Sequence, residues 1–195
     1  KYALFYDNHT MPQCPDVGHG FDVEHFTGRV KNCGVDYLTF HARCNLGMSY
    51  YDTDIGIRHP SLKYDLFGQL AESCQQKGIA LTAYLNAGIS SAEGRAHPEW
   101  CRIDPDGRIY AENKVDPYVR TMCFNSGYHE HLVSMVVEIA EKYNVAGFFL
   151  DCFSSQFCVC KNCIKEMKRL GYDWQDHKSL KKFGQFSAER LAKDI

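Results

Sequence analysis

Polar side chains that could bind or transform a substrate follow four apolar runs of the sequence, at the point where each run ends. Seven residues stand at these ends: Asp7, His9, His41, Arg43, Tyr84, Asn86 and Asp151. Because the carboxyl ends of parallel strands meet at one edge of a sheet, we expect these side chains to converge on one site. A single polar residue at a strand end can be a cap or a loop anchor, so the prediction depends on the repetition. Spacing alone does not separate binding from catalysis.

Asp151 is the strongest catalytic candidate, because it directly follows the apolar run Gly147-Phe-Phe-Leu150. A carboxylate at the end of a buried strand could act as a nucleophile, as a general acid or base, or as a metal ligand. It could also have a structural role, as a helix cap or as an ion-pair partner.

Three cysteines form a second constellation, in the run Cys158-Val-Cys160-Lys-Asn-Cys163. Thiolates at this C-x-C-x-x-C spacing can converge on one metal ion, and tetrahedral zinc requires a fourth ligand from elsewhere. Three other cysteines are candidates for that ligand: Cys101, Cys123 and Cys152. Unligated thiols or disulfides are the alternative, but such dense spacing favours a closed structural Zn²⁺ site. The sequence contains no H-E-x-x-H motif, and no catalytic cofactor is expected.

Aromatic and polar residues occur together in the segments between the predicted elements. Tyr51 lies in the run Tyr50-Tyr-Asp-Thr53, and Trp100 ends the run His97-Pro-Glu-Trp100. A sugar stacks its apolar face on aromatic rings and pairs its hydroxyl groups with carboxylates and imidazoles. Tyr51 and Trp100 are therefore predicted walls of a carbohydrate site, although Trp100 could equally pack its loop against the core.

Apolar strand-like runs alternate with helical patterns along the chain. Strands are expected at Tyr2–Tyr6, Tyr37–His41, Ile79–Leu85 and Gly147–Leu150. Helices are expected after Asp22, after Pro60-Ser61 and after Ser126, with more helix beyond the last strand. Gly34 and Gly78 each end a helix just before a strand, in the left-handed position that glycine favours. Such tight junctions and continuous apolar strands indicate parallel strands buried on both faces.

This order indicates the α/β fold class, with a doubly wound sheet and a (β/α)8 TIM barrel as the two candidates. A doubly wound nucleotide-binding fold should carry a glycine-rich turn after its first strand, and neither G-x-G-x-x-G nor G-x-x-x-x-G-K-[ST] occurs. The segments after the strands are long, as expected when function lies at their carboxyl ends. We therefore expect residues 1–195 to form a partial barrel domain, about the N-terminal half, because a whole barrel needs about 250 residues.

The composition excludes several classes of function. Lys and Arg number 22 against 24 Asp and Glu, and this balance provides no cationic surface for nucleic acid or an anionic membrane. Hydrophobic residues make up 45% of the chain, which argues against disorder, and no apolar run reaches the ~18 residues of a membrane span. Ten cysteines are too few for a disulfide scaffold. Reduced zinc-binding cysteines favour a cytoplasmic location.

Several ordered motifs together resemble the barrel domain known as hypothetical glycosyl hydrolase family 6, which occurs in family 151 α-L-fucosidases. The motifs are Phe5-Tyr-Asp-Asn-His-Thr10, Gly47-Met-Ser-Tyr-Tyr51 with His59-Pro60, Asp65-Leu-Phe-Gly68, His97-Pro-Glu-Trp100 and Gly147-Phe-Phe-Leu-Asp151. The resemblance runs over nearly the whole chain and implies a TIM barrel that acts on carbohydrate.

The cysteines are similar to the zinc-binding pattern of family 42 β-galactosidases, in which one cysteine precedes the third helix and three follow the fourth strand. That likeness implies a ligand set of Cys123, Cys158, Cys160 and Cys163. The two patterns differ at the fourth strand, where family 42 enzymes carry an Asn-Glu pair and this chain reads Leu150-Asp151-Cys152. An Asp at this strand end is where α-L-fucosidases keep their nucleophile, so the resemblance implies that role for Asp151.

The resemblance thus implies an exo-acting, retaining glycoside hydrolase of the α-L-fucosidase type, with a carbohydrate substrate and no nucleic-acid or membrane partner. The residues expected to bind that substrate are Asp7, His9, His41, Arg43, Tyr51, Tyr84, Asn86 and Trp100. A catalytically silent, zinc-stabilised carbohydrate-binding barrel is one alternative, and a glycosidase of another specificity such as a β-galactosidase is another. A homo-oligomer could form through regions outside this chain.

Overall fold

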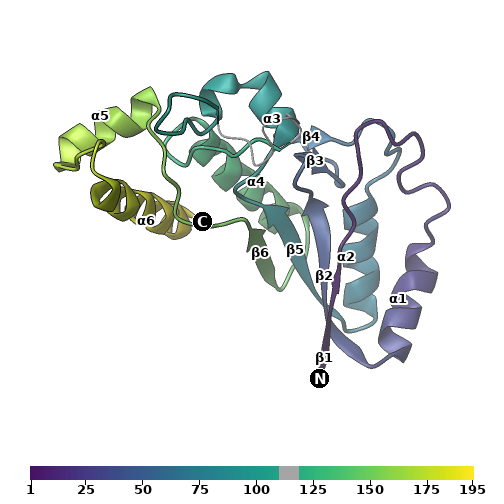
Figure 1. Ribbon diagram of the computed structural model, residues 1–195. Coiled ribbons are helices and arrows are strands. Elements are labelled where there is room, and N and C mark those ends of the chain that lie inside the picture. Colours follow the sequence, from purple (N-terminus) through teal and green to yellow (C-terminus); the bar gives the residue numbers. More distant parts are fainter. Residues whose placement is uncertain (110–118) are drawn as a thin grey trace. The chain divides into compact units, whose positions relative to one another are not determined.

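The computed structural model describes residues 1–109 and 119–195 (Figure 1). These residues form two compact units. The first unit contains Lys1–Asn86 and Met135–Asp151, and the second contains Ala87–Ser134 and Cys152–Ile195. Each unit has its own core and its own cluster of chemically active side chains.

A parallel sheet forms the centre of the first unit. Its main strands are β1 (Tyr2–Tyr6), β2 (Val35–Arg43), β5 (Ala80–Asn86) and β6 (Gly147–Asp151), and they pair in that order. Two short strands, β3 (Met48–Ser49) and β4 (Ile57–Arg58), extend the sheet beside the end of β2. The four predicted strands are therefore present and parallel, whereas β3 and β4 are too short for a hydrophobic pattern to reveal.

Helices α1 (Val23–Asn32) and α2 (Leu66–Gln76) contact each other and pack against the sheet, and α4 (Tyr128–Lys142) leads into β6 (Figure 1). The Asp22 carboxylate caps α1 by accepting from the backbone N–H of His25 at 2.9 Å. Helix α2 begins later than the expected start after Pro60-Ser61. The Asp65 carboxylate accepts from the backbone N–H of Gly68 at 2.8 Å and so defines the first turn.

The two helix-to-strand junctions follow the sequence prediction. Gly34 and Gly78 have φ values of +78° and +61°, which lie in the left-handed region. A side chain would be strained at either position, and glycine allows the chain to leave the helix and enter the strand within one or two residues. This sharp reversal keeps β2 and β5 parallel to β1.

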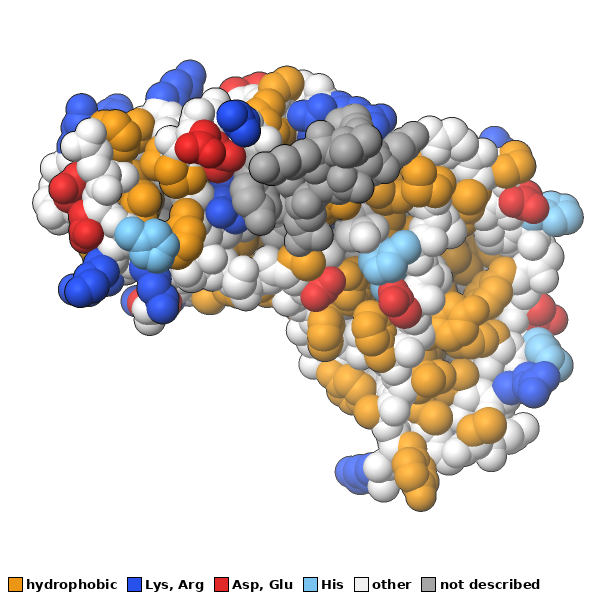
Figure 2. Space-filling view, in the orientation of Figure 1, with side chains coloured by type: hydrophobic (Ala, Val, Ile, Leu, Met, Phe, Trp, Pro, Cys, Tyr) orange, Lys and Arg blue, Asp and Glu red, His pale blue; other side chains and the backbone are white. Residues whose placement is uncertain are grey.

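Burial divides the strands into two pairs. The central strands β2 and β5 are buried, as predicted, but the prediction of burial is wrong for β1, which is largely exposed, and for β6, which is half-buried. Among the described residues β1 pairs with β2 alone and β6 with β5 alone, so each is an edge strand. Phe5 and Phe149 are 46% and 44% exposed, and hydrophobic side chains gather over this part of the surface (Figure 2).

The second unit is helical. It contains α3 (Ser91–Ala96), the 3₁₀-helix η1 (Pro98–Trp100), the beginning of α4, α5 (Lys161–Leu170) and α6 (His177–Asp194). Its core joins the cysteines to Met167, Leu180 and Phe183. The predicted helix beyond the last strand is thus confirmed as α5 and α6. Within residues 1–109 and 119–195, no helix has the length and apolar character required to cross a membrane.

Candidate functional site

The four parallel strands place their side chains in two successive layers on one face of the sheet. The lower layer is aromatic and consists of Phe5, His41, Tyr84 and Phe149, with neighbouring ring centroids 4.0–5.9 Å apart. Side chains on one face of a strand recur every second residue, so the next layer is polar. It contains Asp7, Arg43, Asn86 and Asp151. The predicted convergence of strand-end residues therefore holds on these strands.

Asp151 receives two hydrogen bonds from β5. The Tyr84 hydroxyl donates to Asp151 Oδ2 at 2.6 Å, and Asn86 Nδ2 donates to the same oxygen at 3.1 Å. Hydrogen bonds to an ionised carboxylate are shorter and stronger than those between neutral groups. The half-buried Asp151 side chain is thus held in a defined orientation at the carboxyl end of β6.

The backbone turns sharply directly after Asp151. Cys152 has a φ of +53°, a left-handed value that costs a non-glycine residue about 1–2 kcal/mol. Gly88 lies against this turn so closely that a β-carbon there would be 2.1 Å from the Cys152 carbonyl oxygen. Strained backbone of this kind concentrates at functional sites. Sequence reasoning missed this feature, since no local pattern marks a left-handed cysteine.

Asp7 joins His9, in the segment that follows β1, to His41, on β2. Its Oδ1 atom lies 3.0 Å from His9 Nε2 and 3.1 Å from His41 Nε2, and the two imidazole rings meet edge to face with centroids 4.6 Å apart. Asp7 and His9 are accessible, whereas His41 is fully buried and stacks on Tyr84 at 4.0 Å. These three groups are also close enough together to share a cation.

The two histidines differ in their affinity for a proton. Burial, followed by the positive charge of His9, lowers the pKa of His41 to about 4. A hydrogen bond with the Cys44 thiol, together with the nearby Asp7 charge, outweighs desolvation and raises the pKa of His9. His41 therefore remains neutral near pH 7, whereas His9 binds a proton more readily. The site thus combines two imidazoles of different proton affinity with the side chains of Asp7 and Asp151.

Two other predicted substrate-binding residues of the first unit have structural contacts. The buried Arg43 donates from Nη1 to the backbone carbonyl oxygen of Asn86, which braces the ends of β2 and β5. Tyr51 is also fully buried, and its hydroxyl donates to Glu138 Oε2 at 2.9 Å. A sugar wall needs an exposed ring face, and Tyr51 offers none in this structure. We therefore do not retain Tyr51 as a wall.

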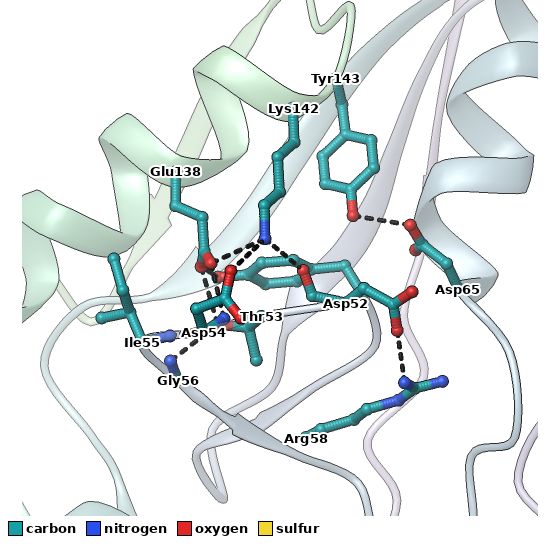
Figure 3. A network of polar contacts seen from close by, with 11 residues as sticks. Asp52, Thr53, Asp54, Ile55, Gly56, Arg58, Asp65, Glu138, Lys142 and Tyr143 are labelled. Atoms are coloured by element: carbon teal, nitrogen blue, oxygen red, sulfur yellow. Dashed lines mark hydrogen bonds and ion pairs between the residues drawn. The ribbon is translucent and has the colours of Figure 1, made fainter.

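Glu138 on α4 is the centre of a polar network that sequence reasoning missed (Figure 3). Its carboxylate accepts from the Tyr51 hydroxyl, from the Thr53 hydroxyl at 2.7 Å and from the Asp54 backbone N–H at 2.7 Å. Burial alone would raise the pKa of Glu138, but these hydrogen bonds and Lys142 lower it. The network fastens residues 44–65, which we call the 44–65 loop, to α4. The sequence signal that could have revealed this network is a charged glutamate on the face of α4 that packs inward.

Trp100 lies in the second unit, in η1, where its ring stacks on His97 with centroids 3.9 Å apart. The indole is half-buried, and the backbone carbonyl oxygen of Trp100 accepts from the Cys123 N–H at 2.8 Å. These contacts pack the loop that precedes α4. A role of Trp100 as a sugar wall stays a prediction.

The second cluster consists of four buried cysteines in the second unit: Cys123, Cys158, Cys160 and Cys163. Their sulfur atoms all lie within 4.8 Å of one another, and Cys123 Sγ is 3.6 Å from Cys160 Sγ and 3.4 Å from Cys163 Sγ. A tetrahedral zinc with Zn–S bonds of ~2.3 Å would separate its sulfurs by ~3.8 Å, so the donor set and its size fit such an ion. The predicted cluster is confirmed.

The structure also decides among the three candidates for the fourth ligand. Cys123 joins the cluster, whereas Cys101 donates its thiol to the Gly94 carbonyl oxygen and Cys152 is exposed. In the described parts of the chain, which include all ten cysteines, none forms a disulfide. Hydrogen bonds from the other three cysteines, Cys123 foremost, lower the pKa of Cys160. The shared hydrogen bonds thus favour the thiolate, the form that binds metal, at Cys160, whereas they raise the pKa of Cys123.

Backbone and amide N–H groups surround these sulfurs. The Ile103 N–H donates to Cys158 Sγ at 3.4 Å, and the Asn125 N–H donates to Cys123 Sγ at 3.4 Å. Asn125 Nδ2 donates to Cys163 Sγ at 3.2 Å. Such outer contacts orient the ligands of a metal site.

Comparison with known proteins agrees with this geometry. Residues 22–152 match the protein family described as Hypothetical glycosyl hydrolase 6. The chain belongs to this family. No curated protein sequence matches it. Membership in the hypothetical glycosyl hydrolase 6 family confirms the resemblance carried by the sequence motifs, and it makes a glycosidase-like domain the framework for the site.

Three solved structures are similar to the chain. Alpha-L-fucosidase isoenzyme 2 from Paenibacillus thiaminolyticus matches with a TM-score of 0.91 and 25% identity over 99% of this chain and 29% of its own. A hypothetical protein from Ruminiclostridium thermocellum has a TM-score of 0.59 at 12% identity and covers 86% and 85% of the two chains. Thermotoga maritima alpha-fucosidase has a TM-score of 0.53 at 18% identity, over 72% and 31%.

These matches confirm the fold class. The α/β fold, with its parallel sheet, corresponds to part of the TIM-barrel domain of fucosidases. The chain spans less than a third of the Paenibacillus thiaminolyticus protein. Membership of this family implies a carbohydrate ligand.

Proposed function

We propose that the chain supplies the nucleophile and part of the sugar site of a retaining, exo-acting glycoside hydrolase of the α-L-fucosidase type. The observation that carries this proposal is Asp151. Its carboxylate stands at the carboxyl end of β6 and accepts hydrogen bonds from Tyr84 and Asn86. The Asp7–His9–His41 group lies at the carboxyl ends of β1 and β2 in the same sheet.

The reaction uses two displacements. In the first, an Asp151 oxygen forms a bond to the anomeric carbon while the glycosidic bond breaks, and the leaving oxygen takes the bonding electron pair and a proton. In the second, water attacks the same carbon, gives its proton to the group that protonated the leaving oxygen, and releases Asp151 as a carboxylate. Tyr84 and Asn86 hold Oδ2 and so orient the Asp151 carboxylate at the carboxyl end of β6. We assign no residue to the required proton donor.

His9, His41 and Asp7 supply the sugar-binding groups of this proposal. The accessible His9 donates to a sugar hydroxyl, while the Asp7 side chain accepts from one. The fully buried His41 acts through Asp7, whose Oδ1 atom lies 3.1 Å from His41 Nε2. The aromatic layer beneath, with Phe5 and Phe149, provides an apolar surface for a sugar carbon face. Arg43 acts indirectly, through the backbone of Asn86.

A panel of aryl glycosides tests the reaction. The natural full-length protein and its Asp151→Ala variant are assayed with aryl α-L-fucoside, aryl β-D-galactoside and other aryl glycosides. We expect turnover of the α-L-fucoside and its loss in the variant, with an unchanged circular dichroism spectrum. Turnover that persists in Asp151→Ala would remove this residue from the mechanism. Sugar binding without turnover of any substrate would instead indicate a catalytically silent carbohydrate-binding domain.

We also propose that the four-cysteine cluster holds a structural Zn²⁺. All four ligands are thiolates in a buried core, so no coordination position remains for substrate, which is typical of structural zinc. Metal analysis of the purified protein should give about one zinc per chain. Absence of zinc, combined with rapid alkylation of Cys158, Cys160 and Cys163, would contradict the proposal.

A further inference from the structure

Two loops of the first unit are joined by a buried tyrosine. Tyr50, in the 44–65 loop, is fully buried, and its hydroxyl lies 2.6 Å from Thr10 Oγ1. The same hydroxyl accepts from the Thr10 backbone N–H at 3.3 Å and lies 3.4 Å from the Asn8 carbonyl oxygen, to which it can donate. Tyr50 thus contacts the residues on both sides of His9.

Further contacts continue along the same pair of loops. His59 Nε2 lies 2.9 Å from the Met11 carbonyl oxygen and therefore donates, which leaves Nδ1 to accept from Ser61. The Ser61 hydroxyl accepts from the backbone N–H of Val17 at 3.2 Å. The segment that begins at Asp7 is consequently fastened to the 44–65 loop over most of its length.

Within the 44–65 loop, Tyr50 is itself fixed by hydrogen bonds of its backbone. The Tyr50 backbone N–H donates to the Ala42 carbonyl oxygen on β2, and the Tyr50 carbonyl oxygen accepts from Phe67 at the start of α2. Glu138 and Lys142 hold the next residues of the loop on α4 (Figure 3). The Tyr50 backbone is therefore held by β2 and α2, so the position of Tyr50 does not depend on the contact between its hydroxyl and Thr10.

Residues 7–10 depend on such contacts, because they follow β1 and have no regular secondary structure of their own. The Cys44 thiol adds a contact, since it forms hydrogen bonds with both the Tyr50 hydroxyl and the His9 ring. Tyr50 therefore holds the residues on both sides of His9, and Cys44 lies beside His9 and Tyr50.

We propose that Tyr50 is a positioning residue that sets the places of Asp7 and His9 for sugar binding. The inference rests on the proposed function, because it names the residue that holds two sugar-binding side chains of the proposed site in place. Tyr50 touches no reacting atom. Its loss would free the 7–10 segment to move, and a displacement of ~1 Å in a binding group can lower the rate about 100-fold.

The neighbouring tyrosine provides a matched control. Tyr50→Phe removes the hydroxyl that holds Asn8 and Thr10, whereas Tyr51→Phe removes the hydroxyl that meets Glu138. Both rings are fully buried and each variant loses one oxygen from the same loop. The two substitutions should therefore lower the unfolding temperature similarly, and only Tyr50→Phe should change the site.

Two measurements on the full-length protein separate these effects. One is the affinity for α-L-fucose together with kcat and KM for its aryl glycoside, and the other is the ¹H–¹⁵N NMR spectrum of the His9 and His41 rings. Tyr50→Phe should weaken fucose binding about tenfold, raise KM more than it lowers kcat, and shift the His9 signals. Thr10→Val should reproduce these changes, and the double variant should add little.

Three results would decide against the proposal or its foundation. Equal effects of Tyr50→Phe and Tyr51→Phe on fucose affinity and on the histidine signals would overturn the positioning role. Unchanged His9 signals in Tyr50→Phe would do the same. If the wild-type protein neither binds nor hydrolyses fucosides, the proposed function fails, while the NMR comparison still decides whether Tyr50 holds His9.

Discussion

The two clusters of reactive side chains differ in almost every physical respect. The four-cysteine cluster of the second unit is closed, with all four sulfur atoms buried in a hydrophobic core. The Asp7–His9–His41 group of the first unit is open, since Asp7 and His9 are accessible and only His41 is buried. The sulfurs lie close to one another, whereas the side chains of Asp7 and His9 have sides that a solute can reach.

This difference suits the closed cluster to stabilising the fold and the open group to binding a substrate. A metal that satisfies four buried thiolates contributes its binding energy to folding and leaves nothing for a substrate. An open set of donors and acceptors is incompletely satisfied until a ligand arrives. The predictions below test whether the closed cluster acts on stability alone and the open one on recognition and chemistry.

Zinc removal should have the largest effect. Structural zinc contributes on the order of 10 kcal/mol to the folding of small metal domains, so a strong chelator or Cys163→Ser should unfold α5 and α6. Hydrogen exchange should show lost protection from Lys161 to Asp194, while β2 and β5 remain protected. The exposed Cys33→Ser serves as the control. Unchanged protection after complete metal removal would contradict a stabilising role of the closed cluster.

Acid should destabilise the first unit through His41. The unfolded chain binds a proton at this residue near pH 6.5, but the folded chain binds it only near pH 4. Stability from a neutral His41 is therefore complete above pH 6.5 and is lost as the pH falls towards 4, by at most about 3 kcal/mol. Urea unfolding between pH 4 and 7 measures this slope. His41→Gln should flatten it, and the exposed His25→Gln should not.

The outer contacts of the closed cluster should tune its metal affinity. Zn²⁺ with four thiolates carries two net negative charges, which buried N–H donors must stabilise. Asn125 donates to Cys163, and Arg190 donates to the Asn125 amide oxygen at 2.6 Å. Asn125→Leu should lower zinc affinity about 10–100-fold and shift the sulfur-to-Co²⁺ charge-transfer bands.

Asn162→Leu, on α5 between two ligands, is the matched control for that experiment. It makes the same substitution within the cysteine run, and in the described residues its side chain donates to no sulfur. Equal losses of zinc affinity in the two variants, with identical Co²⁺ spectra, would show that the Asn125 contacts are incidental.

Tyr84→Phe should have the smallest effect, and only on the open site. The change removes the 2.6 Å hydrogen bond to Asp151 Oδ2 but leaves the donor from Asn86. A lost hydrogen bond to a charged group should lower kcat/KM about tenfold. Zinc content should stay constant. A similar loss in Tyr6→Phe, on β1, would attribute the effect to the sheet as a whole.

Local patterns in the sequence predicted much of both clusters. Strand periodicity placed Asp7, Asn86 and Asp151 at the carboxyl ends of parallel strands, and spacing predicted a metal site from Cys158, Cys160 and Cys163. These predictions succeed because a strand shows its faces every second residue and a short run of thiols cannot spread far apart.

Contacts between distant segments were not predictable in this way. Glu138 meets Tyr51 across 87 positions, so nothing near Tyr51 reveals that its ring is buried instead of exposed to a sugar. Helix α2 starts at Leu66 because Asp65 caps it there. The apolar pattern begins earlier in the sequence and therefore predicted an earlier start. The exposure of β1 and β6 depends on strand order, which periodicity does not contain.

The spacing of the sequence by itself determined the α/β order, the strand-end residues and three of the four clustered cysteines, and the family resemblance added Cys123. Spacing sufficed because these features depend on neighbours only a few positions apart. Tertiary structure alone decided that Asp7 meets both His9 and His41, and that Tyr50 joins the loops beside them. Each of these depends on register and packing between segments tens of residues apart, which local propensity does not encode.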